Sequence, residues 1–191
     1  VFSMVSVVIN NDEDDVSHDL LAGGGDRYAT VWRKGKQENG RVDTIWKVEE
    51  QLGPHTGWVK DISCQTIISA CCEDEETFIF SIGCNCIEVW SLVSGKYQHQ
   101  HKLQIESSVE MGSTLSSDLL CLATYSECDA ATNEGAGANY LLAGGVDGRI
   151  HRWTIHNNKF SNAGVISAHN GRLNAMAVCI GMNVLVSVGN D

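Results

Sequence analysis

The chain has 191 residues, 43% hydrophobic and 19% charged, so it can bury a core. Its formal net charge of −11 argues against nucleic-acid binding, because contact with phosphates depends on Lys and Arg. No apolar run approaches the roughly 18 residues that a membrane span requires, so we expect none. We expect any partner to be a protein with a basic or neutral contact surface.

The first segment of the chain is predicted to form four strands. Phe2 to Ile9 is a near-continuous apolar run, typical of a buried strand. Asn10 to Asp19 is acidic and contains no Lys or Arg, so we expect a loop there. Leu20 to Trp32 is a hairpin pattern: an apolar run, a Gly-rich turn with Asp26, and a β-branched run that ends in Trp. Thr44 to Glu49 alternates like a half-exposed outer strand.

The hairpin pattern recurs along the chain. It returns as Leu141 to Trp153, with Asp147 in the turn, and in degenerate form as Ile79 to Trp90, where the turn Asp is replaced. A fourth copy runs from Val184 to Asp191. Trp90 follows Trp32 by 58 residues, and Trp153 follows Trp90 by 63. The chain is therefore predicted to be a repeat protein.

The other predicted strands keep the same order within each repeat. The inner strands are Trp58 to Thr66, Leu119 to Tyr125 and Arg172 to Ile180, and the outer strands end near Gln104 and Ile166. The stretch from Ser126 to Asn139 is rich in Gly, Ala, Asn and Thr, so we expect a surface loop there.

This hairpin with a terminal Trp resembles the WD-repeat β-propeller family over essentially the whole chain. In that family a Gly-His pair opens each blade, and Pro54-His55 and Ala168-His169 are similar to it with the Gly replaced. The family's Asp after the Trp is replaced by Arg33, Ser91 and Thr154. The resemblance implies an all-β fold, a β-propeller built of four-stranded antiparallel blades.

The resemblance also implies how many blades are present. Blades of this family take about 40 to 45 residues. The longer steps of 58 and 63 residues between the tryptophans indicate insertions, so 191 residues leave room for about three and a half blades. We expect blade 1 at about residues 1–52, blade 2 at 53–106, blade 3 at 107–167, and a partial blade 4 at 168–191. Val1 is not an initiator Met, and Asp191 lies six residues before an expected Trp. The expectation is one incomplete domain of a ring of about seven or eight blades.

The family suggests a structural role for the most conspicuous polar residues. In such propellers the opener His, a strand-two Ser or Thr, the turn Asp and the strand-three Trp form a buried hydrogen-bond network in each blade. The positions that match are His55, Ser81, Trp90, Asp26, Trp32, Asp147, Trp153, His169, Ser187 and Asp191. His169, Ser187 and Asp191 also have the residue types of a catalytic triad, but we expect them to be structural.

Motifs of enzymes and metal sites are missing from the sequence. It contains no phosphate loop, no dinucleotide fingerprint, no Gly-x-Ser-x-Gly and no His-Glu-x-x-His. No Cys-x-x-Cys occurs among the 8 cysteines, which are expected to be reduced thiols of an intracellular protein, cytoplasmic or nuclear. His99 and His101 share a strand face without a third ligand nearby, and we favour exposed histidines. We therefore predict no catalytic, cofactor-binding or metal-binding residue.

Acidic residues gather in the stretches between the first and second strands of the repeats. These stretches, which also contain Asp19 and Glu134, hold half of the chain's 24 Asp and Glu residues. The family places such loops on one face, which implies an arc of negative potential for a basic protein partner. The residues assigned to this partner surface are Asp12, Glu13, Asp14, Asp15, Glu73, Asp74, Glu75, Glu76, Glu127 and Asp129.

A second candidate surface lies on the opposite rim. The family places Trp58, Lys60 and Arg172 there, together with Arg27, Arg149 and Asn174. Trp58 is expected either to contact a partner or to pack against the neighbouring blade, because aromatic and Arg anchors dominate interfaces.

These features predict a non-enzymatic protein-interaction scaffold or recognition module, a subunit of a larger complex without direct nucleic-acid contact. One alternative is a substrate-receptor subunit of a complex such as a ubiquitin ligase. Another is a propeller enzyme or small-ligand receptor that uses the central channel. A fold alone does not distinguish among these functions.

Overall fold

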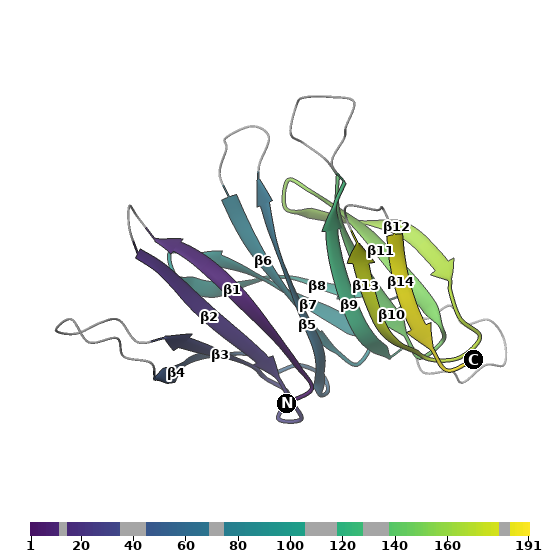
Figure 1. Cartoon of the computed structure of the whole chain (residues 1–191), viewed down its shortest axis with the longest axis horizontal. Coiled ribbons are helices and arrows are strands. Elements are labelled where there is room, and N and C mark those ends of the chain that lie inside the picture. Colours follow the sequence, from purple (N-terminus) through teal and green to yellow (C-terminus); the bar gives the residue numbers. More distant parts are fainter. Residues whose placement is uncertain (12–14, 35–44, 69–74, 106–117, 128–137, 180–183) are drawn as a thin grey trace.

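The computed structural model describes residues 1–11, 15–34, 45–68, 75–105, 118–127, 138–179 and 184–191. Within these ranges every regular element is a β-strand, and the strands number 14 (Figure 1). The same ranges contain no helix with the length and apolarity needed to cross a lipid bilayer. The predicted all-β class is confirmed.

The strands form antiparallel sheets in chain order. Sheet 1 comprises β1 (Ser3–Asn11), β2 (Asp15–Gly23), β3 (Ala29–Lys34) and β4 (Trp46–Leu52). Sheet 2 comprises β5 (Val59–Ile68), β6 (Glu75–Gly83), β7 (Cys86–Val93) and β8 (Lys96–Gln104). Sheet 3 comprises β9 (Leu119–Ser126), β10 (Asn139–Gly145), β11 (Arg149–His156) and β12 (Lys159–Ser167), and sheet 4 pairs β13 (Leu173–Cys179) with β14 (Val184–Gly189).

The three tryptophans at the ends of the predicted hairpins occupy equivalent positions. Trp32, Trp90 and Trp153 lie on the third strand of sheets 1, 2 and 3. On the second strand they pair with Leu20, Ile79 and Leu141. In every case the pairing with the fourth strand shifts by one residue directly before the Trp, which is a β-bulge. The blade-like repeat that the Trp spacing predicts is therefore present.

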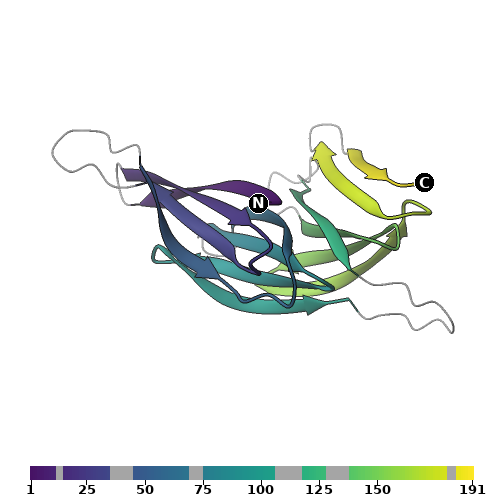
Figure 2. The same ribbon diagram turned by 90° about the horizontal axis from the view of Figure 1, so that it is seen from below.

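Neighbouring sheets pack face to face, and Figures 1 and 2 show them following one another from sheet 1 to sheet 4. Leu21, Val31, Ile79 and Trp90 belong to the core between sheets 1 and 2. Phe80 and Leu141 belong to the core between sheets 2 and 3, and Leu142 and Leu173 to the core between sheets 3 and 4. The first strands β1, β5, β9 and β13 lie side by side.

The first and second strands are longer than the sequence predicts. The prediction of a loop from Asn10 to Asp19 is wrong, because β1 continues to Asn11 and β2 begins at Asp15. In sheet 2, likewise, β6 begins at Glu75. Strand pairing uses backbone groups, so it continues past the point where the apolar side chains stop.

Asp19 is buried rather than part of an acidic surface. Arg33 donates from Nε to Oδ1 at 2.8 Å and from its terminal nitrogen to Oδ2 at 2.7 Å. The hydroxyl of Tyr97, on β8, donates to Oδ2 at 3.0 Å. The hydrogen bonds to Asp19 raise the pKa of Arg33, while burial and the charge of Asp19 raise the pKa of Tyr97. This cluster joins sheet 1 to sheet 2.

We expect Arg33→Ala to lower the free energy of unfolding by about 3 kcal/mol. That value is at the low end for a broken buried ion pair, because Arg33 is partly exposed whereas Asp19 is fully buried. Tyr97→Phe removes one hydrogen bond to the same carboxylate and should cost about 1.5–3 kcal/mol. Urea unfolding measures the free energy of unfolding of both variants. A negligible loss in Arg33→Ala would contradict a stabilising role for the ion pair.

Candidate functional site

Residues at the starts of the four inner strands line an open hollow of about 260 Å³. These strand starts lie at the lower edge of the molecule in Figure 1. The residues that line the hollow are Phe2, Trp58, Lys60, Leu120, Arg172 and Asn174. Every sheet contributes at least one of them.

Three of these side chains are directed by β-bulges. β5, β9 and β13 each carry one extra residue near the start: Lys60, Leu120 and Asn174. A bulge leaves its extra residue outside the regular pairing and redirects the side chain. The sequence thus builds the hollow by repeating one backbone irregularity in three successive sheets.

Two aromatic rings stand open to solvent in the hollow. Trp58 is 59% exposed and Phe2 is 57% exposed. The rings stack with their centroids 5.8 Å apart and their planes 22° apart. The backbone amide of Val59 donates to the carbonyl of Gly24 at 3.0 Å, which anchors the chain next to Trp58 on sheet 1.

The hollow also contains two basic side chains. Lys60 Nζ lies 3.2 Å from the carboxylate of Asp118, so its charge is partly balanced. Arg172 is exposed at the start of sheet 4. Asn174 donates from Nδ2 to the side-chain oxygen of Asn190 at 2.7 Å. An aromatic pair next to a guanidinium suits an acidic or aromatic group of a partner.

The half-buried carboxylate of Asp61, which follows Lys60 in the chain, holds the inner strands together. Ser3 donates from Oγ to Asp61 Oδ1 at 2.6 Å, and the amide of Leu122 donates to Oδ2 at 2.7 Å. Asp61 therefore connects β1, β5 and β9. These contacts make the wall of the hollow part of the framework.

The structure brings Trp58, Lys60, Arg172 and Asn174 together, as the sequence predicts. Arg27 and Arg149 do not line this hollow. The carbonyl of Arg27 accepts a hydrogen bond from the amide of His55 at 2.9 Å, and Arg149 lies 4.0 Å from Asp147. Sequence reasoning missed Phe2 and Leu120. Leu120 could have been found from the sequence, because it is the second residue of an inner strand, as Lys60 is.

The described residues include part of the predicted acidic surface. Glu75 and Glu76 begin β6, and Glu127 follows β9, at the end of the sheets opposite the hollow. Glu127 accepts a hydrogen bond from the hydroxyl of Tyr140 at 3.2 Å. The side chain of Asp15 and the residues Asp12, Glu13, Asp14, Glu73, Asp74 and Asp129 lie outside the described part.

His55, Ser81 and Trp90 are joined by hydrogen bonds within the core of sheet 2. His55 Nδ1 lies 3.1 Å from the carbonyl of Arg27, which can only accept, so Nδ1 carries the proton. Ser81 therefore donates to His55 Nε2, at 2.6 Å. The indole of Trp90 donates to Ser81 Oγ at 3.1 Å. Burial lowers the pKa of His55, so the imidazole is held neutral.

His169, Ser187 and Asp191 form the corresponding arrangement on sheet 4. His169 Nδ1 donates to Asp191 Oδ1 at 2.8 Å, and His169 Nε2 lies 3.0 Å from Ser187 Oγ. The hydrogen bond from His169 lowers the pKa of Asp191. Such geometry also occurs in catalytic triads. The same His–Ser pair is buried at His55 and Ser81, and a structural role for both pairs stays our prediction.

The other two turn aspartates have local partners. Asp26 accepts a hydrogen bond from the amide of Tyr28 at 3.2 Å, and Asp147 accepts one from the amide of Arg149 at 3.1 Å. Both are turn contacts two residues along the chain. Their predicted tryptophan partners differ in burial: Trp153 is buried, and Trp32 is half-buried.

The histidines His99 and His101 have protein partners. His99 lies 2.8 Å from Glu88, and His101 Nε2 lies 3.2 Å from the carbonyl of Asn158. Glu88 also pairs with Lys102 at 2.9 Å. Burial opposes ionisation of Glu88, but the hydrogen bonds from Lys102 and His99 prevail and lower its pKa. Among the described residues no group of three His, Cys, Asp or Glu side chains is placed to hold a metal ion.

No known protein family matches the chain, and no curated protein sequence matches it. Two solved structures similar to it are computationally designed proteins. Ika4 has a TM-score of 0.56 at 14% identity over 98% of this chain and 84% of its own. Ika8 has a TM-score of 0.55 at 14% identity over 98% of this chain and 42% of its own, so this chain spans less than half of Ika8. This likeness shows the fold alone.

We expect stability to fall as the pH drops below about 6.5, the ordinary pKa of histidine. The folded protein lowers the pKa of His55, so the unfolded chain binds the proton first, and acid favours unfolding. Urea unfolding should show that the free energy of unfolding falls less between pH 7.5 and pH 5 in His55→Gln than in the unmodified chain. His151→Gln should also show a smaller loss, because burial lowers the pKa of His151 too. An unchanged pH dependence in His55→Gln would contradict the assignment.

Proposed function

We propose that this chain is a non-enzymatic protein-interaction module of the WD-repeat β-propeller type, part of a ring of about seven or eight blades. Three four-stranded sheets with a Trp at the same third-strand position support this proposal. The hydrogen bonds among His55, Ser81 and Trp90 also fit the network expected of such blades.

The observation that carries the proposal is the exposed stack of Phe2 on Trp58. Two large aromatic side chains are more than half exposed, although the hydrophobic effect favours their burial. Strand ends from several sheets form the hollow that contains them, and Arg172 lines it as well. Rigid aromatic and Arg anchors provide most of the binding energy at protein interfaces. We propose that a protein segment docks here.

The acidic end of the sheets is the second proposed surface. Glu75 and Glu76 begin β6, and Glu127 lies just beyond β9. Clustered carboxylates accelerate the approach of a basic protein. We propose that a basic partner is captured there, within a larger complex. The described cysteines are free thiols, which is consistent with a cytoplasmic or nuclear location.

Trp58→Ala tests the hollow. We expect it to lower the affinity for the principal protein partner at least about tenfold, the effect of a typical hot-spot residue, with little change in Tm. The partner is identified by affinity capture on the unmodified chain and then titrated as a purified protein. Trp46→Ala is the matched control, because Trp46 is 40% exposed on β4, outside the hollow. A lower Tm with unchanged partner affinity would mean that Trp58 serves packing alone.

Neutralising Glu73 to Glu76 with Gln and Asn tests the acidic surface. We expect association with a basic partner, or with a polylysine probe, to slow several-fold at low salt without loss of folding. The effect should vanish as salt rises from 0.1 M to 1 M, because the screening length falls from about 10 Å to about 3 Å. Stopped-flow association rates measure this. An association rate that changes neither with the substitutions nor with the salt concentration would refute electrostatic capture.

A further inference from the structure

The loop between β12 and β13 contains an asparagine followed by a glycine, Asn170-Gly171. In such a pair the backbone nitrogen of the glycine can attack the side-chain amide carbon of the asparagine, because no Cβ on the glycine obstructs ring closure. The sequence contains one other Asn-Gly pair, Asn39-Gly40, which lies outside the described residues. Asn170-Gly171 is therefore the pair whose surroundings the structure shows.

Both groups that react in this pair are free of hydrogen bonds. Asn170 is exposed to solvent. Within the described ranges, neither the side-chain amide of Asn170 nor the backbone amide of Gly171 has a hydrogen-bond partner. No bond to the rest of the protein therefore has to break before the nitrogen can approach the amide carbon.

The equivalent loop of sheet 2 shows that the free glycine amide belongs to the repeat. Thr56-Gly57 follows His55 there, as Asn170-Gly171 follows His169. Sheet 2 has four strands, and among the described residues the amide of Gly57 has no partner either. The hydroxyl of Thr56 donates to the carbonyl of Gly83 at 2.9 Å. The asparagine in place of this threonine thus adds a reactive amide to a loop that leaves the glycine nitrogen free.

A chemically related pair in the turn of sheet 3 is held by hydrogen bonds. The amide of Gly148 donates to the carbonyl of Gly145 at 3.3 Å. The carboxylate of Asp147 accepts a hydrogen bond from the amide of Arg149 at 3.1 Å. Both groups that ring closure needs are engaged in this Asp-Gly pair. The structure therefore separates a protected turn from the unprotected loop at Asn170.

We propose that Asn170 is a site of spontaneous deamidation, a covalent modification that needs only water as co-reactant. The Gly171 nitrogen loses its proton and bonds to Cγ of Asn170, while the bond from Cγ to the side-chain nitrogen breaks and ammonia leaves. This gives a five-membered succinimide. Water then cleaves the ring at the bond from nitrogen to Cγ, which gives aspartate, or at the bond from nitrogen to the backbone carbonyl carbon, which gives isoaspartate.

Isoaspartate at position 170 disturbs a close backbone contact between sheets 3 and 4. A Cβ on Gly148 would collide with the carbonyl oxygens of His169 and Gly171, so the turn of sheet 3 lies directly against this loop. The amides of Ala168 and His169 both donate to the carbonyl of Gly148 at 3.1 Å. Isoaspartate lengthens the main chain by one methylene carbon, and closely packed regions accommodate added atoms only by moving. We expect these two hydrogen bonds to loosen.

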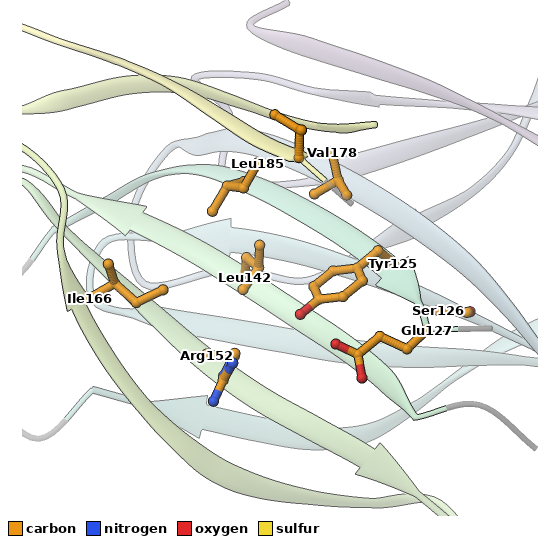
Figure 3. Close-up of a pocket in the computed structure, with 9 residues that line it drawn as sticks. Tyr125, Ser126, Glu127, Leu142, Arg152, Ile166, Val178 and Leu185 are labelled. Carbon is orange, nitrogen blue, oxygen red and sulfur yellow. The ribbon is translucent and has the colours of Figure 1, made fainter. Parts of the chain in front are cut away.

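The side-chain core between the same sheets lies farther along the strands. There Leu185 of sheet 4 packs against the core that contains Leu142 of sheet 3 (Figure 3). Neither residue is in contact with the loop through a hydrogen bond of its side chain, since both side chains are apolar. We therefore expect the modification to loosen the loop locally while this core persists.

The first test incubates the folded Asn39→Gln chain at mildly alkaline pH, so that the other Asn-Gly pair does not contribute. Peptide mapping by mass spectrometry locates the conversion, and methylation by a protein isoaspartate methyltransferase quantifies isoaspartate. We expect Asn170 to convert at least about tenfold faster than the exposed Asn158, because the next residue there, Lys159, carries a Cβ. Conversion no faster than at Asn158, or conversion that requires unfolding in urea, would overturn the proposal.

The second test measures the consequence for the contact with Gly148. The converted chain is separated by ion exchange, since it gains a negative charge. We expect the amides of Ala168 and His169 to exchange hydrogen several-fold faster in the isoaspartate form than in the fresh chain.

Two freshly prepared variants are the matched controls. Asn170→Gln keeps the amide but would require a larger ring, so it should neither convert nor change the exchange. Asn170→Asp carries the new charge on a normal backbone and should also leave the exchange unchanged. Equal exchange in the isoaspartate form and the fresh chain, or the same acceleration in Asn170→Asp, would overturn the proposed backbone effect. No readout uses a protein partner, so the outcome is independent of the function proposed for the hollow.

Discussion

Burial of sheet faces against neighbouring sheets is the interaction on which the rest of this structure depends. A four-stranded sheet has two faces, and both faces of sheet 2 are buried against neighbouring sheets. Ile79 and Trp90 face sheet 1, while Phe80 and Val89 face sheet 3. This explains why β6 and β7 read as nearly continuous apolar runs instead of alternating ones. The stacking also sets the first strands side by side, so their irregular starts converge in one hollow. The shape of the hollow therefore depends on packing that occurs well away from it.

Much of the fold is legible in the sequence, because hairpins are encoded locally. Turn chemistry and β-branched runs place β3, β7 and β11, and the spacing of Trp32, Trp90 and Trp153 reveals their equivalence. The turns at Ser94-Gly95 and Asn157-Asn158 have the positive φ values that tight hairpins need. The lengths of β1 and β2 were not predictable in the same way. Their ends depend on backbone pairing, which the acidic composition of the segment conceals.

The candidate site was predictable in part. The resemblance to the propeller family implied that Trp58, Lys60, Arg172 and Asn174 share one rim. Trp58 and Arg172 directly precede an inner strand, and Lys60 and Asn174 are the second residues of those strands. Phe2 was read as an ordinary strand residue, because its exposure depends on how sheet 1 meets sheet 2. Asp19 was misjudged for a similar reason: its partner Tyr97 lies 78 residues away. Contacts between sheets at such distances leave no periodic trace in the sequence.

The hollow draws its lining from all four sheets, from Phe2 before β1 to Asn174 on β13. In stacked repeats each unit contacts only its neighbours. A segment seated in the hollow would contact all four described sheets at once. It would link sheets that are not adjacent, and its binding energy would stabilise their arrangement. Occupancy would then be coupled to the cooperativity of unfolding, although no residue of the hollow belongs to the large apolar cores.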